Sequence, residues 1–292
     1  MPLVTAIITT HKRKPELVQR ALDSVLAQTY PNMEIIVVDD SPSEFAYREA
    51  IKQLVQEKGA QYIAHEVCQG ACVARNTGLA AAKGEFVAFL DDDDEWLPPK
   101  IEKQIQKIRD GVALVYCGHY VHNSDTNQRK QAITAQKTGN IHGDLLCSNF
   151  IGSTSFPLLR TSVLKEIGGF DPQMQSAQDY DVWLRIAEKY EVEFVPDPLV
   201  VYYVYSGERI SKSYHKKVAG LERIISKNRT YLKKNQKAYW GRHLELAPYY
   251  AGNGQLGRSI LSWLKAAARC PLELKENLRH LYWIMRIVAG KQ

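Results

Sequence analysis

Two largely apolar runs in this chain each end in consecutive aspartates. Gly84–Leu90 leads directly into Asp91–Asp94, and Met33–Val38 leads into the pair Asp39 and Asp40. Runs of this length predict strands, and in an open α/β sheet the ligand lies beyond the carboxyl ends of the strands. Adjacent carboxylates repel one another unless a cation neutralises them, and their oxygens suit Mg²⁺ or Mn²⁺ carried by a substrate phosphate. The pattern therefore predicts a metal–diphosphate site at one sheet edge.

The segments around these runs alternate between strand and helix patterns. Four strands alternating with helices indicate a mostly parallel, Rossmann-like α/β sheet flanked by helices, with right-handed crossovers. The expected strands are 3–10, 33–40, 60–66 and 84–90, and the helices between them are 15–28, 43–58 and 69–84.

The pattern continues less regularly up to about residue 211. A helix is expected over 100–109 and a strand over 112–121, whereas 123–140 is polar and poorly patterned, as in a surface loop or a loop over a site. Residues 153–172 indicate a strand, a helix and a Gly-Gly turn. A further helix and a final strand are then expected over 177–190 and 192–205.

Beyond residue 211 the pattern is wholly helical and strongly basic. Residues 212–292 carry 17 Lys or Arg against 4 Asp or Glu, whereas residues 1–211 carry 21 against 28. We therefore expect a catalytic domain over 1–211 and a basic helical C-terminal extension over 212–292. Basic amphipathic helices with aromatic residues suit an anionic membrane surface, and plain packing against the catalytic domain is the alternative. We do not expect a nucleic-acid partner.

Composition is that of an ordinary globular protein. The chain is 45% hydrophobic and 24% charged, and no stretch approaches about 18 uncharged apolar residues. Its five cysteines are scattered, without zinc-site spacing. We expect reduced thiols and a cytoplasmic protein, with peripheral contact at the inner face of the cell membrane if the tail binds lipid.

Six motifs, taken in order over about residues 3–211, resemble glycosyltransferase family 2, the inverting enzymes of GT-A fold. A strand enters T-x-x-R, and V-V-D-D-x-S, A-R-N-x-G, F-L-D-D-D-D-x-W-x-P and G-G-F-D follow, before an acidic residue that precedes W-L-R. The resemblance implies transfer of a sugar from a nucleoside-diphosphate sugar, with UDP or dTDP favoured, to a glycan or lipid-linked acceptor. It further implies bacterial surface polysaccharide biosynthesis and a Mn²⁺ or Mg²⁺ cofactor.

The resemblance also implies roles for residues of the donor half of the site. Asp39 would accept a hydrogen bond from the base, and Arg75 would orient the diphosphate at a helix start. Metal ligation would come from the D-x-D triplet, and a structural arginine paired with an aspartate is the alternative for Arg75. By the same resemblance, Thr9 and His11 would contact the nucleotide, Asp92 the ribose, and Asp91 and Asp93 the metal.

On the acceptor side the resemblance implies that Asp179 is the catalytic base. The acceptor hydroxyl must lose a proton as it attacks, and a carboxylate can take it. The family's usual preceding Glu is Gln178 here, which leaves the neighbouring Asp181 as a rival. Further acceptor-side or loop candidates, each with a plain structural alternative, are Ser153, Thr154, Trp183 and Arg209.

Two other functions remain as alternatives. A sugar-phosphate nucleotidyltransferase shares the sheet and the metal, but it usually carries a Gly-rich loop after the first strand, and Thr9–Glu16 contains no glycine. A non-catalytic nucleotide-sugar-binding protein on a degenerate scaffold is compatible with Gln178, although the intact acidic cluster argues against it. Oligomeric state is not indicated by the sequence.

Overall fold

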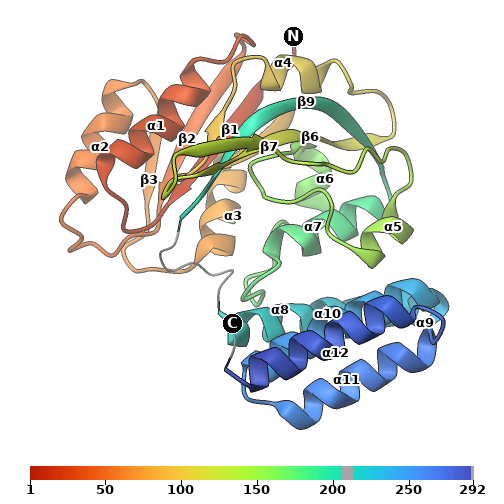
Figure 1. Ribbon diagram of the computed structural model, residues 1–292. Helices are drawn as coiled ribbons and strands as arrows, with labels where there is room; N and C mark the ends of the chain where they lie inside the picture. The colour runs from red at the N-terminus through yellow and green to blue at the C-terminus, as the bar shows by residue number, and fades with distance from the viewer. Residues whose placement is uncertain (206–212, 291–292) are drawn as a thin grey trace. The chain divides into compact units, whose positions relative to one another are not determined.

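The computed structural model describes residues 1–205 and 213–290, and these divide into two compact units (Figure 1). The first unit comprises Met1–Ile141, Phe150–Pro172 and residues 185–205. The second comprises His142–Asn149, Gln173–Leu184 and the described residues after 212. Two short segments of the expected catalytic domain therefore belong to the unit that contains the C-terminal helices. The expected boundary between residues 211 and 212 stays a prediction.

The first unit is built on a nine-stranded sheet with the order β3-β2-β1-β4-β8-β6-β9-β5, and β7 pairs with β6. The strands β3, β2, β1 and β4 are mutually parallel, as the alternating pattern predicts. Beyond β4 the sheet becomes mixed, because β8 runs antiparallel to both β4 and β6. The strands are β1 (Val4–Thr10), β2 (Met33–Asp39), β3 (Gln61–Ala64), β4 (Phe86–Asp91), β5 (Glu95–Trp96), β6 (Val112–Asn123), β7 (Gln128–Gln131), β8 (Leu158–Arg160) and β9 (Glu191–Val204).

Helices cover both faces of the parallel half of this sheet. Apolar side chains of α1 (Pro15–Leu26) and α2 (Arg48–Glu57) share one core with alternate residues of β1 and β4. On the opposite face α3 (Ala71–Ala81) lies so close that a Cβ on Gly78 would be 2.5 Å from Cγ2 of Ile7. Alternation of buried residues on both faces is what a central parallel sheet requires. The remaining helices wholly within this unit are α4 (Lys100–Ile105) and α6 (Thr161–Glu166).

The second unit is helical. Its small core joins Val218 and Leu221 of α8 to Leu246 and Tyr250 of α10. The first turns of α7 (Gln178–Ala187) belong to this unit, whereas its last turn is counted with the first unit. The other helices of the unit are α5 (His142–Cys147), α8 (Tyr214–Lys227), α9 (Arg229–Lys234), α10 (Gln236–Gly252), α11 (Leu256–Arg269) and α12 (Leu274–Val288).

Several local expectations were wrong in detail. The strand expected from residue 153 is limited to Leu158–Arg160, because Ser153–Pro157 turns back toward the ends of the strands. Within the polar stretch 123–140, Gln128–Gln131 forms β7 by pairing with β6. Helix α2 begins at Arg48, five residues later than expected, after a turn-rich segment.

A fully buried lysine lies beneath the sheet. Lys100 Nζ donates to Oε1 of Gln104 at 2.9 Å and lies 4.1 Å from the ring centroid of Trp96. Burial lowers the pKa of Lys100 from 10.5 to about 8. The unfolded chain therefore binds more protons than the folded chain between these two pH values, so this lysine makes the free energy of unfolding rise with pH there.

We predict that Lys100→Met removes this pH dependence. Relative to the variant, the wild-type free energy of unfolding should increase by roughly 1–3 kcal/mol between about pH 7 and pH 10, because one pKa unit corresponds to about 1.4 kcal/mol. Urea unfolding at the two pH values measures the difference. The exposed Lys107→Met serves as the matched control and should keep the wild-type dependence. An unchanged dependence in Lys100→Met would contradict the prediction.

Candidate functional site

The three central parallel strands end level with one another. In the ladder of β1, Thr9 lies opposite Asp91 of β4 and Thr10 lies opposite Asp39 of β2. Asp39 in turn lies opposite Ala64, the last residue of β3. The register therefore brings both acidic clusters and the end of β1 to the same edge of the sheet. The edge is the ligand-binding edge of an open α/β sheet.

Asp39 is fully buried, and both of its oxygens accept hydrogen bonds. Oδ1 accepts from the main-chain N–H of Ser41, and Oδ2 accepts from the hydroxyl of Tyr62, each at 2.8 Å. A hollow of about 520 Å³ lies beside Tyr62. Since each carboxylate oxygen has two lone pairs, this fixed carboxylate retains acceptor capacity for a further donor.

Asp40 is also buried, and it is held by the loop that precedes α3. Its carboxylate accepts from the main-chain N–H groups of Gln69 and Gly70 at 2.8 Å, and it lies 2.7 Å from Nδ1 of His65. Burial alone would raise the pKa of Asp40, but these hydrogen bonds outweigh it and lower the pKa below its ordinary value. Asp40 therefore anchors the loop at residues 69–70.

Two arginines pair with the acidic triplet Asp91–Asp93 at the end of β4. The guanidinium of Arg13 bridges Asp92 and Asp93, with Nε 2.9 Å and Nη2 3.0 Å from their carboxylate oxygens. Arg75 Nη2 lies 2.7 Å from Oδ1 of Asp91. Both arginines precede β4 in the chain, Arg13 in the loop after β1 and Arg75 in α3. The two guanidinium groups thus compensate part of the negative charge of the three carboxylates.

The burial of these carboxylates differs. Burial, opposed by the charge of Arg13, raises the pKa of Asp92 to about 6. Asp94 is fully buried, and its pKa is raised well above its ordinary value by burial and then by the charges of Asp91 and Asp93. Its Oδ2 accepts from Ser155 Oγ at 2.6 Å, so Asp94 braces the turn, while Asp91 and Asp93 remain half-buried.

Hydroxyls from the segment before β8 also reach this cluster. Oγ1 of Thr154 lies 3.2 Å from both oxygens of Asp91, and Oγ of Ser153 lies 3.4 Å from Oδ2. Ser153 and Thr154 are therefore brought to the donor-side carboxylate. Their expected place on the acceptor side stays a prediction.

Two reciprocal hydrogen bonds join the A-R-N-x-G motif to the G-G-F-D motif. Asn76 Nδ2 donates to the main-chain oxygen of Phe170 at 2.7 Å, and Phe170 N donates to Asn76 Oδ1 at 2.8 Å. A Cβ on Gly169 would lie 2.4 Å from that same oxygen, and its φ of 68° is one that glycine readily adopts. These contacts hold the neighbouring Arg75 against Asp91. This pairing is the one described by the alternative for Arg75, a structural arginine paired with an aspartate.

The donor set around Asp91 and Asp93 fits a divalent metal ion. It consists of carboxylate oxygens, which Mg²⁺ and Mn²⁺ prefer, and its excess negative charge already attracts two guanidinium groups. A cation entering here would replace Arg13 as the partner of Asp93. Ligation by Asp91 and Asp93 nevertheless stays a prediction.

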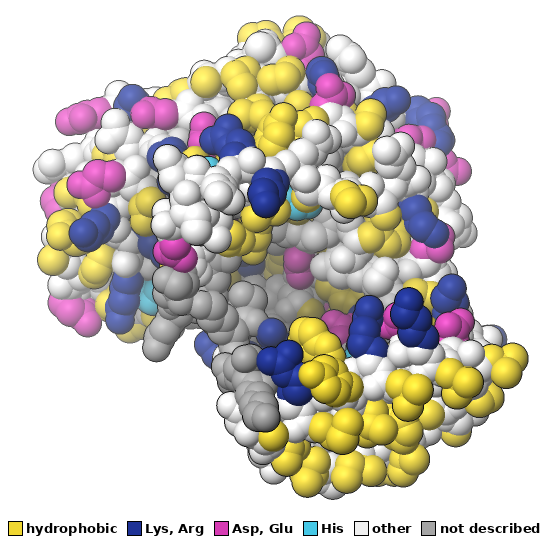
Figure 2. Space-filling view, in the orientation of Figure 1, with side chains coloured by type: hydrophobic (Ala, Val, Ile, Leu, Met, Phe, Trp, Pro, Cys, Tyr) yellow, Lys and Arg dark blue, Asp and Glu magenta, His cyan; other side chains and the backbone are white. Residues whose placement is uncertain are grey.

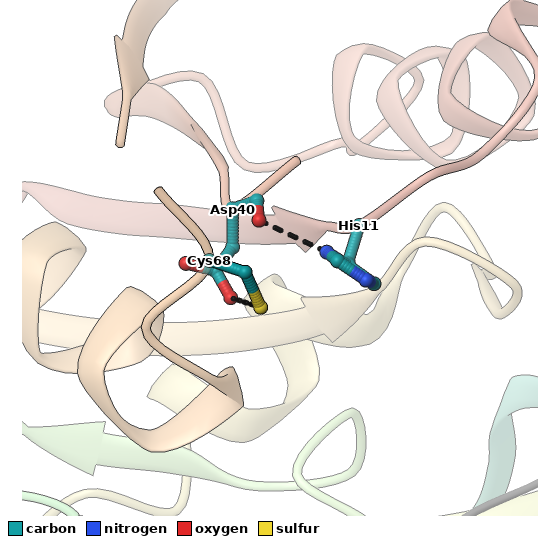
Figure 3. A group of neighbouring side chains, drawn as sticks. All are labelled: His11, Asp40 and Cys68. Carbon is teal, nitrogen blue, oxygen red and sulfur yellow. Dashed lines mark hydrogen bonds between the residues drawn. The ribbon is translucent and has the colours of Figure 1, made fainter. Parts of the chain in front are cut away.

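A second group of potential metal ligands lies nearby (Figure 3). Single ligand atoms of His11, Asp40 and Cys68 all lie within 4.8 Å of one another. Cys68 Sγ lies 3.2 Å from Oδ2 of Asp40, and burial and this carboxylate raise the pKa of the thiol. His11 Nδ1 lies 2.9 Å from the main-chain oxygen of Asp40. Because the thiol stays protonated and serves as a donor, this mixed group suits a hard ion less well than the oxygens of the D-x-D triplet.

Asp179 lies in the first turn of α7, in the second unit, and is half-buried. Its rival Asp181 is almost fully buried and forms an ion pair with Lys227 of α8. Within this unit the start of α7 is firmly held. The Tyr180 hydroxyl donates to the main-chain oxygen of Leu145, and a Cβ on Gly220 would lie 2.4 Å from Oγ of Ser176. Asp181 is therefore structural, which leaves Asp179 as the candidate base.

Two remaining candidates have different outcomes. Trp183 is completely buried, which favours a core residue over sugar stacking. Arg209 lies outside the described residues. Contacts also identify site residues that the sequence reasoning missed: Arg13, Tyr62 and His65. For Arg13 a signal was available, because it is the arginine of T-x-x-R.

Comparison with known proteins identifies the family. The sequence model of the family described as "Glycosyl transferase family 2" matches residues 5–168, which is more than half of the chain. The chain is similar to a provisionally named colanic acid biosynthesis glycosyl transferase, WcaA, of Escherichia coli (strain K12). Identity is 28% over 242 residues, which covers 82% of this chain and 85% of that protein.

A second relative carries a defined reaction in its name. The UDP-Glc:alpha-D-GlcNAc-diphosphoundecaprenol beta-1,3-glucosyltransferase WfgD of Escherichia coli is 30% identical over 185 residues. The match covers 63% of this chain and 69% of WfgD.

Solved structures agree on the fold. The chain is similar to S. aureus TarS 1-349 in complex with UDP-GlcNAc, with a TM-score of 0.62, 17% identity, and coverage of 98% of this chain and 81% of that one. It is also similar to the mannosyltransferase PcManGT of Pyrobaculum calidifontis in complex with GDP-Man and Mn²⁺, with a TM-score of 0.59, 16% identity, and coverage of 99% and 87%. The GT-A fold expected from the motifs is confirmed. This chain belongs to glycosyl transferase family 2 and is a glycosyltransferase.

Proposed function

We propose that this glycosyltransferase transfers a sugar from UDP- or dTDP-sugar to a hydroxyl of a glycan or lipid-linked acceptor, with inversion and with a divalent metal ion. One observation carries the donor half of the proposal. The register of β1, β2 and β4 brings Asp39 and the D-x-D triplet to the same sheet edge, where Arg13 and Arg75 also lie. An acceptor for a base, cations for phosphates and oxygens for a metal are the groups that a nucleotide sugar needs.

Asp39 would recognise the base. A uracil or thymine ring offers an imide N–H, and the carboxylate of Asp39 would accept it. Tyr62 and Ser41 hold this carboxylate in one orientation, so it would need no reorganisation when the base arrives.

Arg13 and Arg75 would bind the diphosphate. A guanidinium matches the geometry of phosphate oxygens, and both arginines already face the cluster where the metal would be held. When bound, the metal ion would stabilise the negative charge of the departing nucleoside diphosphate. Asp91 and Asp93 would hold it, and Asp92 would reach the ribose.

Asp179 would act as the general base in a single displacement. The acceptor oxygen forms a bond to the anomeric carbon while the bond from that carbon to the diphosphate oxygen breaks. The hydroxyl proton passes to Asp179, and the electron pair of the broken bond leaves with the nucleoside diphosphate. One displacement inverts the anomeric configuration.

Relatives support a role in bacterial surface polysaccharide synthesis. WcaA is named for colanic acid biosynthesis, and the TuaG protein of Bacillus subtilis (strain 168) is provisionally named for teichuronic acid biosynthesis. WfgD acts on a diphosphoundecaprenol-linked sugar according to its name. We extend to this chain the acceptor class, a glycan or lipid-linked sugar, and the bacterial cell-surface setting.

The first test is calorimetric titration with UDP, dTDP and GDP, with and without Mn²⁺. We expect one nucleotide to bind in a metal-dependent way, and Asp93→Asn should weaken this binding at least about tenfold because it removes one charged ligand. Asp110→Asn, an exposed aspartate away from the strand ends, is the matched control. Nucleotide binding that is unchanged both by removal of Mn²⁺ and by Asp93→Asn would contradict the assignment of Asp93 as a metal ligand.

The second test addresses the base. Asp179→Asn should retain donor binding while turnover falls about 10²–10⁴-fold, which is the usual contribution of a general base. Asp181→Asn is the comparison, because it should lower stability through the loss of the Lys227 ion pair. If Asp179→Asn keeps wild-type turnover with a natural-type acceptor, another group is the base.

The third test addresses Arg13, which competes with any cation for Asp92 and Asp93. Arg13→Gln should tighten binding of Mn²⁺ alone, because the competing positive charge is gone, and should weaken binding of the nucleoside diphosphate. Calorimetry with Mn²⁺ alone and with the nucleoside diphosphate alone measures the two changes in affinity, which should be opposite in direction. Equal weakening of both ligands would instead indicate that the variant disorders the site.

A further inference from the structure

Helix α11 presents large apolar side chains to solvent. Leu256, Ile260, Leu261 and Leu264 lie along one side of the helix and are 43% to 53% exposed. The buried side of the helix is instead formed by Ser259, Ser262 and Ala266. A surface helix of a globular protein normally has the opposite arrangement, with its large apolar residues facing the core.

Polar contacts hold the small-residue side of α11 on α10. The Ser259 hydroxyl donates to the main-chain oxygen of Ala247 at 2.7 Å, and the Ser262 hydroxyl donates to that of His243 at 2.9 Å. These bonds fix the rotation of α11 about its axis. The outward direction of its leucines is therefore determined by specific contacts.

Helix α12 repeats this arrangement. Its apolar side chains Leu274, Leu278, Tyr282, Trp283, Met285 and Val288 are 55% to 64% exposed. On its inner side Asn277 and Ile284 are buried, and Asn277 accepts a hydrogen bond from Trp240 Nε1 at 2.9 Å. Figure 2 shows the hydrophobic side chains gathered over α11 and α12 on one face of the second unit.

Exposed basic residues accompany this apolar face. The two helices carry Arg258, Lys265, Arg269, Lys275, Arg279 and Arg286 against the single acidic residue Glu276. All six basic residues are exposed. The surface therefore combines exposed leucine and aromatic side chains with a strong positive charge, and it needs an occupant that is both apolar and anionic.

We propose that the outward face of α11 and α12 docks on an anionic phospholipid bilayer, with both helices in the plane of the interface. Its leucines would enter the acyl boundary, Trp283 and Tyr282 would lie at the headgroup level, and the Lys and Arg side chains would meet lipid phosphates. Among the described residues no helix has the length and apolar character needed to span a bilayer. This surface is independent of the proposed catalytic reaction.

Charge decides between a bilayer and a second copy of the chain. Two copies facing each other through this surface would bring like charges together on both sides, which is unfavourable. An anionic bilayer reverses the sign of that interaction. Nucleic acid would satisfy the charge but would leave the exposed leucines in water.

The test is co-sedimentation with phosphatidylcholine vesicles that contain or lack phosphatidylglycerol. We expect binding only to the anionic vesicles, with weaker binding at high salt. Two triple variants separate the contributions, one apolar (Leu261→Gln, Leu264→Gln and Leu278→Gln) and one charged (Lys265→Gln, Lys275→Gln and Arg286→Gln). Each should weaken partitioning at least about tenfold, since each loses several favourable side chains.

Control variants carry substitutions of the same kind in the first unit. Leu26→Gln replaces a leucine of similar exposure, and the triple variant of Lys83, Lys107 and Lys130 to Gln removes the same charge. Both should bind vesicles like the wild type. All variants should retain nucleotide binding, which separates a failure of docking from a failure of the proposed function.

Three outcomes would overturn the proposal. The first is absence of binding by the wild type, and the second is equal binding by all variants. In the third, light scattering finds a wild-type dimer that the apolar variant converts to a monomer, which would make this face an interface between copies. Quenching of Trp283 fluorescence by brominated lipids, lost in Trp283→Phe, gives an independent readout of insertion.

Discussion

Compensation of the carboxylate charges at the ends of β2 and β4 is the constraint on which the site depends. The parallel register forces six aspartates to one sheet edge, and a buried charge is tolerated only when it is paired and hydrogen-bonded. The carboxylates hold three different parts of the chain. Asp40 holds the loop before α3, Asp91 holds α3 itself through Arg75, and Asp92 and Asp93 hold the loop after β1 through Arg13. The acidic cluster therefore organises the elements around it as well as offering ligands.

The same residues that stabilise this cluster are the ones a nucleotide sugar would engage. Arg13 and Arg75 compensate the aspartates in the absence of other cations, and a guanidinium that can pair with a carboxylate can also pair with phosphate. These two positive charges consequently compensate only part of the negative charge of the cluster. Asp91 and Asp93 remain half-buried, whereas Asp94 is buried as a brace of the turn.

The C-terminal helices combine two kinds of surface within one unit. Helices α8 and α10 share a core and hold the segments 142–149 and 173–184, including the start of α7 with Asp179. Packing of the tail against the expected catalytic domain, the alternative for the basic tail, stays a prediction. Helices α11 and α12 differ, because most of their large apolar side chains face outward, while the buried side chains are Ser259, Ser262 and Ala266 in α11 and Asn277 and Ile284 in α12.

Sequence patterns predicted the parallel half of the sheet well, because the spacing of apolar residues and the polar residues that end a strand are local properties of the chain. They failed where long-range pairing decided the structure. Gln128–Gln131 is polar and becomes a strand only through its partner β6, and Ser153–Pro157 turns back because its hydroxyls reach Asp91 and Asp94. Tyr62 and His65 had no local signal, since they act on carboxylates of the neighbouring strand β2.

By itself the sequence determined the family, the GT-A fold and the acidic residues at the strand ends, because motif order and apolar period are written along the chain. Only the tertiary structure decided which arginine pairs with which aspartate, that Asp181 is engaged by Lys227, and that Trp183 is core. It alone also decided which side of α11 is buried. A helical period reveals two sides, but the contacts of Ser259 and Ser262 select the one that packs.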